Sequence, residues 1–188
     1  MRRGILGGTF DPPHVAHLVA GETAFRQLGL DTVTYIPAGA PWQKANRQIT
    51  AARHRLAMTG AAIQDVPYFS LDEREVLRDG WSYTFDTLAE YPDDELVLIL
   101  GADAAQRLPT WHRAEEVLSS VRVAAIPRPG TDRAAVETAL HGAVDWLDAP
   151  LLDVSGTELR ERAGRGESLR FLVRDAVWAY IETHSIYD

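Results

Sequence analysis

No cysteine occurs among the 188 residues of the sequence. Disulfide bonds, a thiolate nucleophile, an iron–sulfur cluster and cysteine-ligated zinc are therefore excluded. Long apolar segments are missing as well. The longest unbroken apolar run, from Leu96 to Ala102, is far short of the roughly 20 residues that a membrane-spanning helix needs. We therefore expect a cytoplasmic protein without a membrane partner.

Positive charge is also scarce. The sequence has 19 lysines and arginines against 27 aspartates and glutamates, which leaves a formal net charge of −8. Because binding along a nucleic-acid backbone requires clustered positive charge, we expect no nucleic-acid partner. A small anion at one local site remains compatible with this charge. Hydrophobic residues make up 46% and charged residues 24%, which is typical of globular proteins and excludes disordered and fibrous classes.

Short apolar runs alternate with amphipathic stretches along the whole sequence, as in βαβ units around a parallel sheet. We predict an α/β fold: a Rossmann-like, doubly wound, mostly parallel sheet with helices on both faces, in one domain over residues 1–188. Predicted strands cover residues 4–6, 32–37, 68–71, 96–100, 121–126, 143–147 and 151–154. Predicted helices cover residues 15–28, 51–64, 84–90, 133–140, 157–162 and 175–183, and a long polar loop covers 38–50.

The strongest local signal lies between the first predicted strand and the first predicted helix, where the sequence reads Gly7-Gly8-Thr9-Phe10-Asp11-Pro12-Pro13-His14-Val15-Ala16-His17. Glycines allow backbone N–H groups to approach an anion, and the helix N-terminus adds unpaired donors and a partial positive charge. His14 and His17 are three residues apart, so both can face the same point. The segment therefore predicts a phosphate-binding site.

Other interpretations of this segment remain open. The glycines could form a plain turn, with both histidines at the surface. Asp11, His14 and His17 could instead bind a transition metal, since two histidines and a carboxylate suit zinc or iron. The spacing matches neither the P-loop nor the Gly-x-Gly-x-x-Gly dinucleotide fingerprint.

The segment resembles the signature of the HxGH-type nucleotidyltransferases, Gly-Gly-x-Phe-Asp-Pro-x-His-x-x-His. A second segment, Ser155-Gly156-Thr157-Glu158-Leu159-Arg160, is similar to their second motif, which begins a helix beside the first. Within this superfamily the sequence most resembles the bacterial nicotinate-nucleotide adenylyltransferase family over essentially its whole length. Further matching segments in the same order are Ile36-Pro37-Ala38-Gly39, Ser82-Tyr83-Thr84 with Asp86-Thr87-Leu88, Gly101-Ala102-Asp103-Ala104, Trp111 and Pro127-Arg128-Pro129-Gly130.

This resemblance implies a reaction that joins ATP to nicotinate mononucleotide and yields deamido-NAD and pyrophosphate. The mononucleotide phosphate would attack the α-phosphorus in line, without a covalent enzyme intermediate. Mg²⁺ would be the cofactor, held by substrate phosphates and water instead of a protein cage. The family includes monomers and homodimers, and the sequence does not decide between them.

The resemblance also implies the roles of individual residues. The catalytic set is His14, His17, Lys44 and Arg160. ATP would contact Gly7, Gly8, Thr9, Phe10, His14, His17, Gly101, Asp103, Arg128, Ser155, Thr157 and Arg160. Nicotinate mononucleotide would contact Thr9, Phe10, Lys44, Tyr83, Thr84, Asp103 and Trp111. On the sequence alone, Lys44 could equally be a solvated loop residue, Asp103 a helix cap and Trp111 an ordinary packed aromatic residue.

Three departures from the family pattern bear on nucleotide contacts. Gly156 stands where a second serine is usual, His112 where a tyrosine is common, and Trp42-Gln43 where a Pro-His pair precedes the lysine. Two other functions also stay open. One is a related transferase that takes nicotinamide mononucleotide or phosphopantetheine as acceptor, and the other is a regulator that binds ATP without turnover.

Overall fold

The structure is a computed structural model that describes residues 1–41 and 49–187. Its tertiary contacts divide the chain into two compact units. Unit 1 comprises Met1–Gly7, Val19–Thr34 and Tyr83–Asp153, and unit 2 comprises Gly8–Leu18, Tyr35–Ser82 and Val154–Asp188. Within the described residues, no helix is long and apolar enough to cross a membrane.

In the described part of the chain, six strands form one sheet in the order β3-β2-β1-β4-β5-β6. Their bounds are β1 Arg2–Gly8, β2 Thr32–Pro37, β3 Phe69–Leu71, β4 Glu95–Gly101, β5 Arg122–Ile126 and β6 Asp145–Trp146. The pairs β1–β4, β4–β5 and β5–β6 are parallel. This strand order is that of doubly wound sheets, in which the chain winds outward from the middle of the sheet in two directions. Because the crossovers are right-handed, the two directions place helices on both faces of the sheet. The predicted Rossmann-like α/β fold is confirmed.

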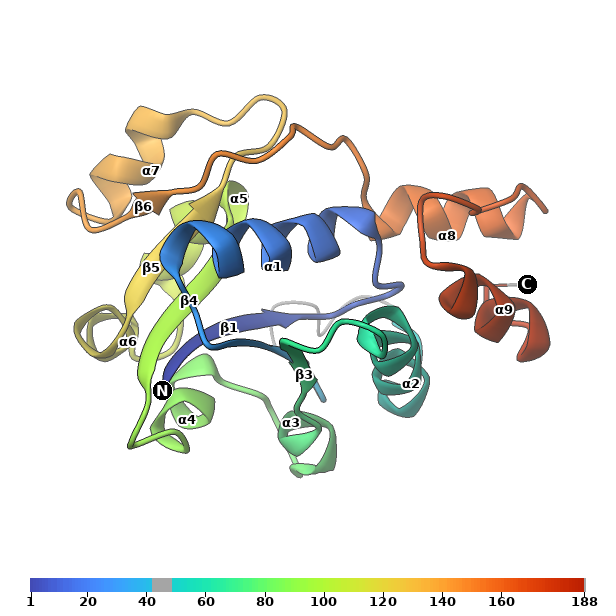
Figure 1. Cartoon of the computed structure of the whole chain (residues 1–188), viewed down its shortest axis with the longest axis horizontal. Coiled ribbons are helices and arrows are strands. Elements are labelled where there is room, and N and C mark those ends of the chain that lie inside the picture. Colours follow the sequence, from blue (N-terminus) through green and yellow to red (C-terminus); the bar gives the residue numbers. More distant parts are fainter. Residues whose placement is uncertain (42–48, 188) are drawn as a thin grey trace. The chain divides into compact units, whose positions relative to one another are not determined.

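Unit 1 is built around β4, which pairs with β1 and β5 (Figure 1). The five residues from Leu96 to Leu100 are all buried, which explains their unbroken apolar pattern: a central parallel strand is covered on both faces. The helices of this unit are α4 Thr84–Ala89, α5 Ala102–Arg107, α6 Ala114–Ser120 and α7 Arg133–Ala139, with the 3₁₀ turn η2 at Leu108–Thr110. Helix α5 packs against α7.

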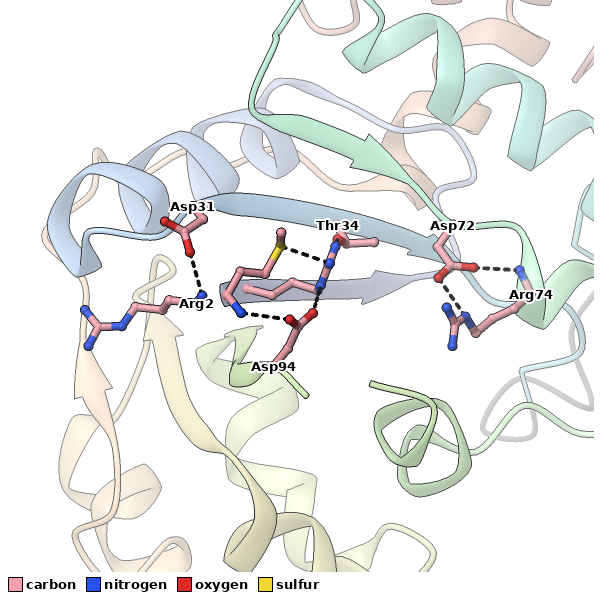
Figure 2. A network of polar contacts seen from close by, with 8 residues as sticks. Arg2, Asp31, Thr34, Asp72, Arg74 and Asp94 are labelled. Atoms are coloured by element: carbon pink, nitrogen blue, oxygen red, sulfur yellow. Dashed lines mark hydrogen bonds and ion pairs between the residues drawn. The ribbon is translucent and has the colours of Figure 1, made fainter. Parts of the chain in front are cut away.

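Unit 2 contains α2 Ala52–Ile63, α3 Arg74–Leu77, α8 Gly156–Gly164 and α9 Asp175–Thr183. Helix α2 packs against α9 and β3, and both helices bury apolar residues: Met58, Ala62 and Ile63 of α2, and Val177 and Ile181 of α9. Asp72 starts α3 by accepting hydrogen bonds from the backbone N–H of Arg74 at 2.9 Å and from its Nε at 2.6 Å (Figure 2). Helix α1, Val15–Leu28, contributes to both units and ends at Gly29, whose φ of +59° suits glycine.

Two of the sequence predictions need correction. Residues 151–154 are mostly apolar but form no strand, because they find no pairing partner and Leu151 is exposed. The predicted strand at 143–147 is reduced to Asp145–Trp146. Helices α3, α5 and α6 were not predicted; each is only four to seven residues long, a length at which the periodic pattern is weak.

A polar network fixes the start of β1 in unit 1 (Figure 2). Asp94, which precedes β4, accepts hydrogen bonds from Arg3 Nε at 2.6 Å and from the amino group of Met1 at 3.0 Å. Arg3 also donates to Thr34 Oγ1 of β2 at 2.9 Å. The hydrogen bond from Arg3 lowers the pKa of Asp94, and burial opposes that shift in part. The network therefore ties β1 to β2 and to the beginning of β4.

We expect Asp94→Asn to lower the free energy of unfolding by about 1–2 kcal/mol at neutral pH, because it removes the charge from a partly buried hydrogen-bond acceptor. Thermal or urea unfolding measures this, with exposed Asp93→Asn as the control of equal charge change. Since the pKa of Asp94 is lowered in the folded state, its contribution is complete above its ordinary value of 3.8 and is lost as the pH falls below it. The difference between wild type and variant should therefore shrink in acid. Equal losses in both variants would show that the network contributes nothing.

Candidate active site

The end of β1 and the loop after it combine an open glycine with a buried aromatic anchor. Gly7 is exposed, and a Cβ atom there would meet no atom within 4 Å, whereas at Gly8 it would lie 3.1 Å from the Phe10 ring. Phe10 is 1% exposed and contacts the rings of His17 and Tyr35, with centroids 4.9 and 5.9 Å away. Its φ of +50° is unusual for a bulky residue and is held by this packing. A ligand could therefore reach the backbone at Gly7, whereas Phe10 is closed to it.

His14 and His17 lie together at the start of α1, as their spacing predicted. Their ring centroids are 3.8 Å apart. The backbone N–H of His14 donates to His17 Nδ1 at 3.1 Å. Because that nitrogen accepts, a neutral His17 carries its proton on Nε2, the form that can donate to a phosphate oxygen.

Asp11 is a buried hub of hydrogen bonds in unit 2. Its carboxylate accepts from the backbone N–H of Thr50 at 3.1 Å and from the Tyr187 hydroxyl at 2.7 Å. Burial raises the pKa of Tyr187, and the negative charge of Asp11 raises it further. Both carboxylate oxygens therefore already have hydrogen-bond donors. Within the ranges 1–41 and 49–187 no group of three or more His, Cys, Asp or Glu residues has the arrangement of a metal site.

The second motif lies beside the first, as the resemblance implied. Arg160 Nη1 donates to the backbone carbonyl of Asp11 at 2.7 Å and lies 4.0 Å from its carboxylate, while Nη2 donates to Thr157 Oγ1 at 3.2 Å. Ser155 begins α8 as its N-cap and accepts from the backbone N–H of Glu158 at 3.2 Å. The arginine fork of the second motif is thus joined directly to the glycine-rich segment.

The departure at Gly156 has a physical explanation in this arrangement. A Cβ atom at residue 156 would lie 2.8 Å from the carbonyl oxygen of Asp11 and 3.3 Å from Arg160 Nη1. The first turn of α8 therefore approaches the backbone of the first motif more closely than a side chain at this position allows.

Unit 1 contributes a second group of candidate residues. Asp103 lies in the first turn of α5 with its carboxylate 3.5 Å from Arg128 Nε and 3.2 Å from Arg107 Nη2. A Cβ atom at Gly101 would lie 2.9 Å from Asp103 Oδ1 and 3.0 Å from Arg128 Nε, so the glycine leaves room for this ion pair. The structure thus brings Gly101, Asp103 and Arg128 together.

The residues expected at the pyridine ring lie on α4 and before α6 in unit 1. Tyr83 precedes the first residue of α4, Thr84. The Tyr83 ring contacts the ring of His112, the residue that follows Trp111, in a tilted arrangement with centroids 4.4 Å apart. The indole Nε1 of Trp111 is buried, and no residue in the described part of the chain accepts its hydrogen. Lys44 and the Trp42-Gln43 pair lie outside the described residues.

Sequence reasoning missed Arg55, the largest fully buried side chain described, at 0% exposed. Its guanidinium donates to three backbone carbonyls: Thr50 at 2.8 Å from Nε, Thr9 at 2.8 Å from Nη1 and Gly39 at 2.9 Å from Nη2. Burial lowers the pKa of Arg55, and the charge of Asp11 partly offsets this effect. The sequence held one signal that this arginine is buried: Arg55 directly precedes Leu56, among the apolar residues of the predicted helix 51–64.

Comparison with known proteins assigns the class. The sequence profile of the cytidylyltransferase-like family matches residues 5–162. The structure of a Plasmodium falciparum nicotinic acid mononucleotide adenylyltransferase complexed with NaAD shares the fold, with a TM-score of 0.83 at 17% identity over 100% of this chain and 97% of that chain.

Two bacterial relatives are more similar in sequence. Probable nicotinate-nucleotide adenylyltransferases of Salinibacter ruber and Exiguobacterium sibiricum are each 42% identical over 191 residues, covering 100% of this chain and 98% and 99% of the relatives. The chain therefore belongs to the cytidylyltransferase-like family and, within it, to the nicotinate-nucleotide adenylyltransferases.

We expect Gly156→Ala to lower the free energy of unfolding by about 1–3 kcal/mol, the usual cost of overpacking, because the new methyl group must displace the Asp11 carbonyl. The affinity for ATP should fall as well, since Arg160 loses its anchor. Thermal unfolding and calorimetric titration with ATP measure the two effects. Gly164→Ala at the end of the same helix is the control, since its Cβ would meet Tyr187 at an ordinary 3.4 Å. Similar stability and ATP affinity in both variants would refute the explanation for Gly156.

Proposed function

We propose that this protein is an enzyme that transfers AMP from ATP to nicotinate mononucleotide, releasing pyrophosphate and forming deamido-NAD. The names of its bacterial relatives support this reaction. The observation that carries the proposal for this chain is the joining of the two motifs through Arg160 and Asp11, because it gathers the groups suited to a triphosphate. We propose that residues 1–188 act as one nucleotidyltransferase domain.

The proposed chemistry is an in-line displacement. A 5′-phosphate oxygen of the mononucleotide bonds to the α-phosphorus of ATP while the bond from that phosphorus to the β-phosphate bridging oxygen breaks, and pyrophosphate leaves with the electron pair. The protein then has to position two anions and stabilise charge on the leaving group. Mg²⁺ enters as the ion of MgATP and neutralises phosphate charge. The residues of unit 2 fit an ion held by the substrate phosphates. Both oxygens of the Asp11 carboxylate already accept hydrogen bonds, from Thr50 and Tyr187, so this carboxylate is not needed as a ligand of Mg²⁺.

Unit 2 supplies the proposed phosphate contacts. His14 and His17 donate to ATP phosphates, with backbone support from Gly8, Thr9 and Phe10. Gly7, which belongs to unit 1, is proposed as a further backbone contact. Arg160 donates to the β and γ oxygens of ATP. A guanidinium has five N–H donors, and the two described hydrogen bonds of Arg160 use one donor on each Nη. The side chain is 31% exposed, so its other donors can reach a phosphate. Ser155 and Thr157 assist from the start of α8. Lys44 is proposed as a further phosphate contact.

Unit 1 supplies the proposed nucleoside and pyridine contacts. Gly101, Asp103 and Arg128 contact the adenosine of ATP, and Asp103 also contacts the mononucleotide. Trp111 packs on the pyridine ring, and backbone N–H groups near Tyr83 and Thr84 bind its carboxylate. An amide presents an NH₂ group that cannot accept those hydrogen bonds, so the nicotinate form is favoured by roughly 10⁴ or more. We further propose a cytoplasmic monomer or homodimer without nucleic-acid or membrane partners.

The reaction is tested by pyrophosphate release from MgATP with nicotinate mononucleotide, nicotinamide mononucleotide and phosphopantetheine as separate acceptors. We expect strong preference for the nicotinate form. Preference for another acceptor would replace the assigned substrate. ATP binding without turnover of any acceptor would point to a regulator, and full activity after chelation and replacement of Mg²⁺ would exclude a transition-metal site.

The role of the histidine pair is tested with His14→Asn. We expect turnover to fall by roughly 10²–10³, the usual effect of removing one donor to developing charge. The control is His141→Asn, an exposed residue of unit 1 at a φ of +51°, which asparagine tolerates. Turnover of His14→Asn within threefold of the control would remove His14 from the catalytic set.

A further inference from the structure

Arg55 places a positive charge in the interior of unit 2 without a carboxylate beside it. Its side chain is 0% exposed, and in the described ranges no acidic group forms an ion pair with it within 4.0 Å. A buried charge is costly unless hydrogen bonds satisfy it. The three backbone carbonyls of Thr9, Gly39 and Thr50 satisfy it at 2.8 to 2.9 Å. The three acceptors belong to three separate segments of the chain.

The first acceptor belongs to the glycine-rich loop itself. Thr9 follows Gly8 and precedes the buried Phe10. The hydrogen bond from Arg55 Nη1 to the Thr9 carbonyl therefore fixes this loop, while Gly7 stays exposed. Gly39 is equally constrained, because a Cβ atom there would lie only 1.9 Å from the carbonyl oxygen of Glu75. The guanidinium of Arg55 therefore links two constrained backbone segments, at Thr9 and at Gly39.

The third acceptor connects Arg55 to the second motif. The carbonyl of Thr50 accepts from Arg55, and its N–H donates to the carboxylate of Asp11. The carbonyl of Asp11 then accepts from Arg160. Tyr187, 176 residues along the chain, donates to the other carboxylate oxygen of Asp11 at 2.7 Å. We call Arg55, Thr50, Asp11 and Tyr187 the buried cluster.

We propose that Arg55 and Tyr187 are positioning residues for the phosphate site: Arg55 fixes the glycine-rich loop at Thr9, and Tyr187 orients Asp11, which holds Arg160. Neither residue has to touch the substrate. The inference rests on the proposed function for its turnover assay, but the predicted effect on ATP binding does not depend on the acceptor. The guanidinium of Arg55 and the phenol of Tyr187 thus keep the two phosphate-binding motifs in their relative positions.

Lysine cannot replace Arg55 in this role. An ammonium group on a flexible chain keeps the charge, but it lacks the planar fork that donates in three fixed directions. We therefore expect Arg55→Lys to lower kcat at least tenfold and to raise KM for MgATP at least threefold. Tyr187→Phe removes one hydroxyl and should raise KM for MgATP several-fold with a smaller change in kcat.

The control must separate positioning from loss of stability. Asp94→Asn weakens a network of unit 1 that has no part in the site, so it should lose stability while keeping wild-type kcat and KM. Steady-state rates are compared well below the lowest unfolding temperature of the set, together with calorimetric titration of a non-hydrolysable ATP analogue. Arg55→Ala is also assayed with added methylguanidinium, which should restore part of its turnover and leave Asp94→Asn unchanged.

Wild-type kcat and KM in folded Arg55→Lys would overturn the role of Arg55. If Arg55→Lys does not fold, Tyr187→Phe decides: wild-type KM and wild-type affinity for the ATP analogue in that variant would overturn the proposal. Failure of the proposed function looks different, because the wild-type protein would then release no pyrophosphate with any acceptor. The comparison of ATP-analogue affinities would still test the buried cluster.

Discussion

The hydrogen bond from Arg160 to the backbone carbonyl of Asp11 joins residues 149 positions apart, and the site of unit 2 depends on it. This contact ties the helix that carries the second motif to the glycine-rich segment. The contact needs close backbone approach, which Gly156 permits, and a rigid acceptor, which Thr50 and Tyr187 provide by holding the Asp11 carboxylate. The buried Asp11 thus organises the groups assigned to the triphosphate.

The architecture explains why chemistry gathers at the ends of particular strands. In a doubly wound sheet the strand order reverses at one point, and ligands bind at the carboxyl ends of the strands near it. Both β1 and β4 end in glycine, at Gly8 and Gly101. At each end the missing side chain leaves space for a neighbouring group, the Phe10 ring in one case and the Asp103–Arg128 ion pair in the other.

Local patterns predicted much of this protein because they reflect local physics. The buried run of β4 is apolar throughout, α1 ends at a glycine with positive φ, and the spacing of His14 and His17 brings their rings together. Three short helices, α3, α5 and α6, were not predicted although α4 and α7 of similar length were, because one or two turns carry only a weak periodic signal. The apolar residues among 151–154 suggested a strand, but a strand also requires a pairing partner, which no local pattern reports.

The sequence by itself determined the α/β fold class, the order of most elements and the two motifs that identify the family, since each depends on residues close together in the chain. Only the tertiary structure decided that Arg55 is a buried guanidinium with three carbonyl acceptors, that Tyr187 reaches Asp11 and that Gly156 serves close approach. These features depend on which backbone groups meet across long separations in the chain. The neighbours of a helical arginine in space decide whether it is solvated or buried. Its neighbours in the sequence do not reveal which residues those are.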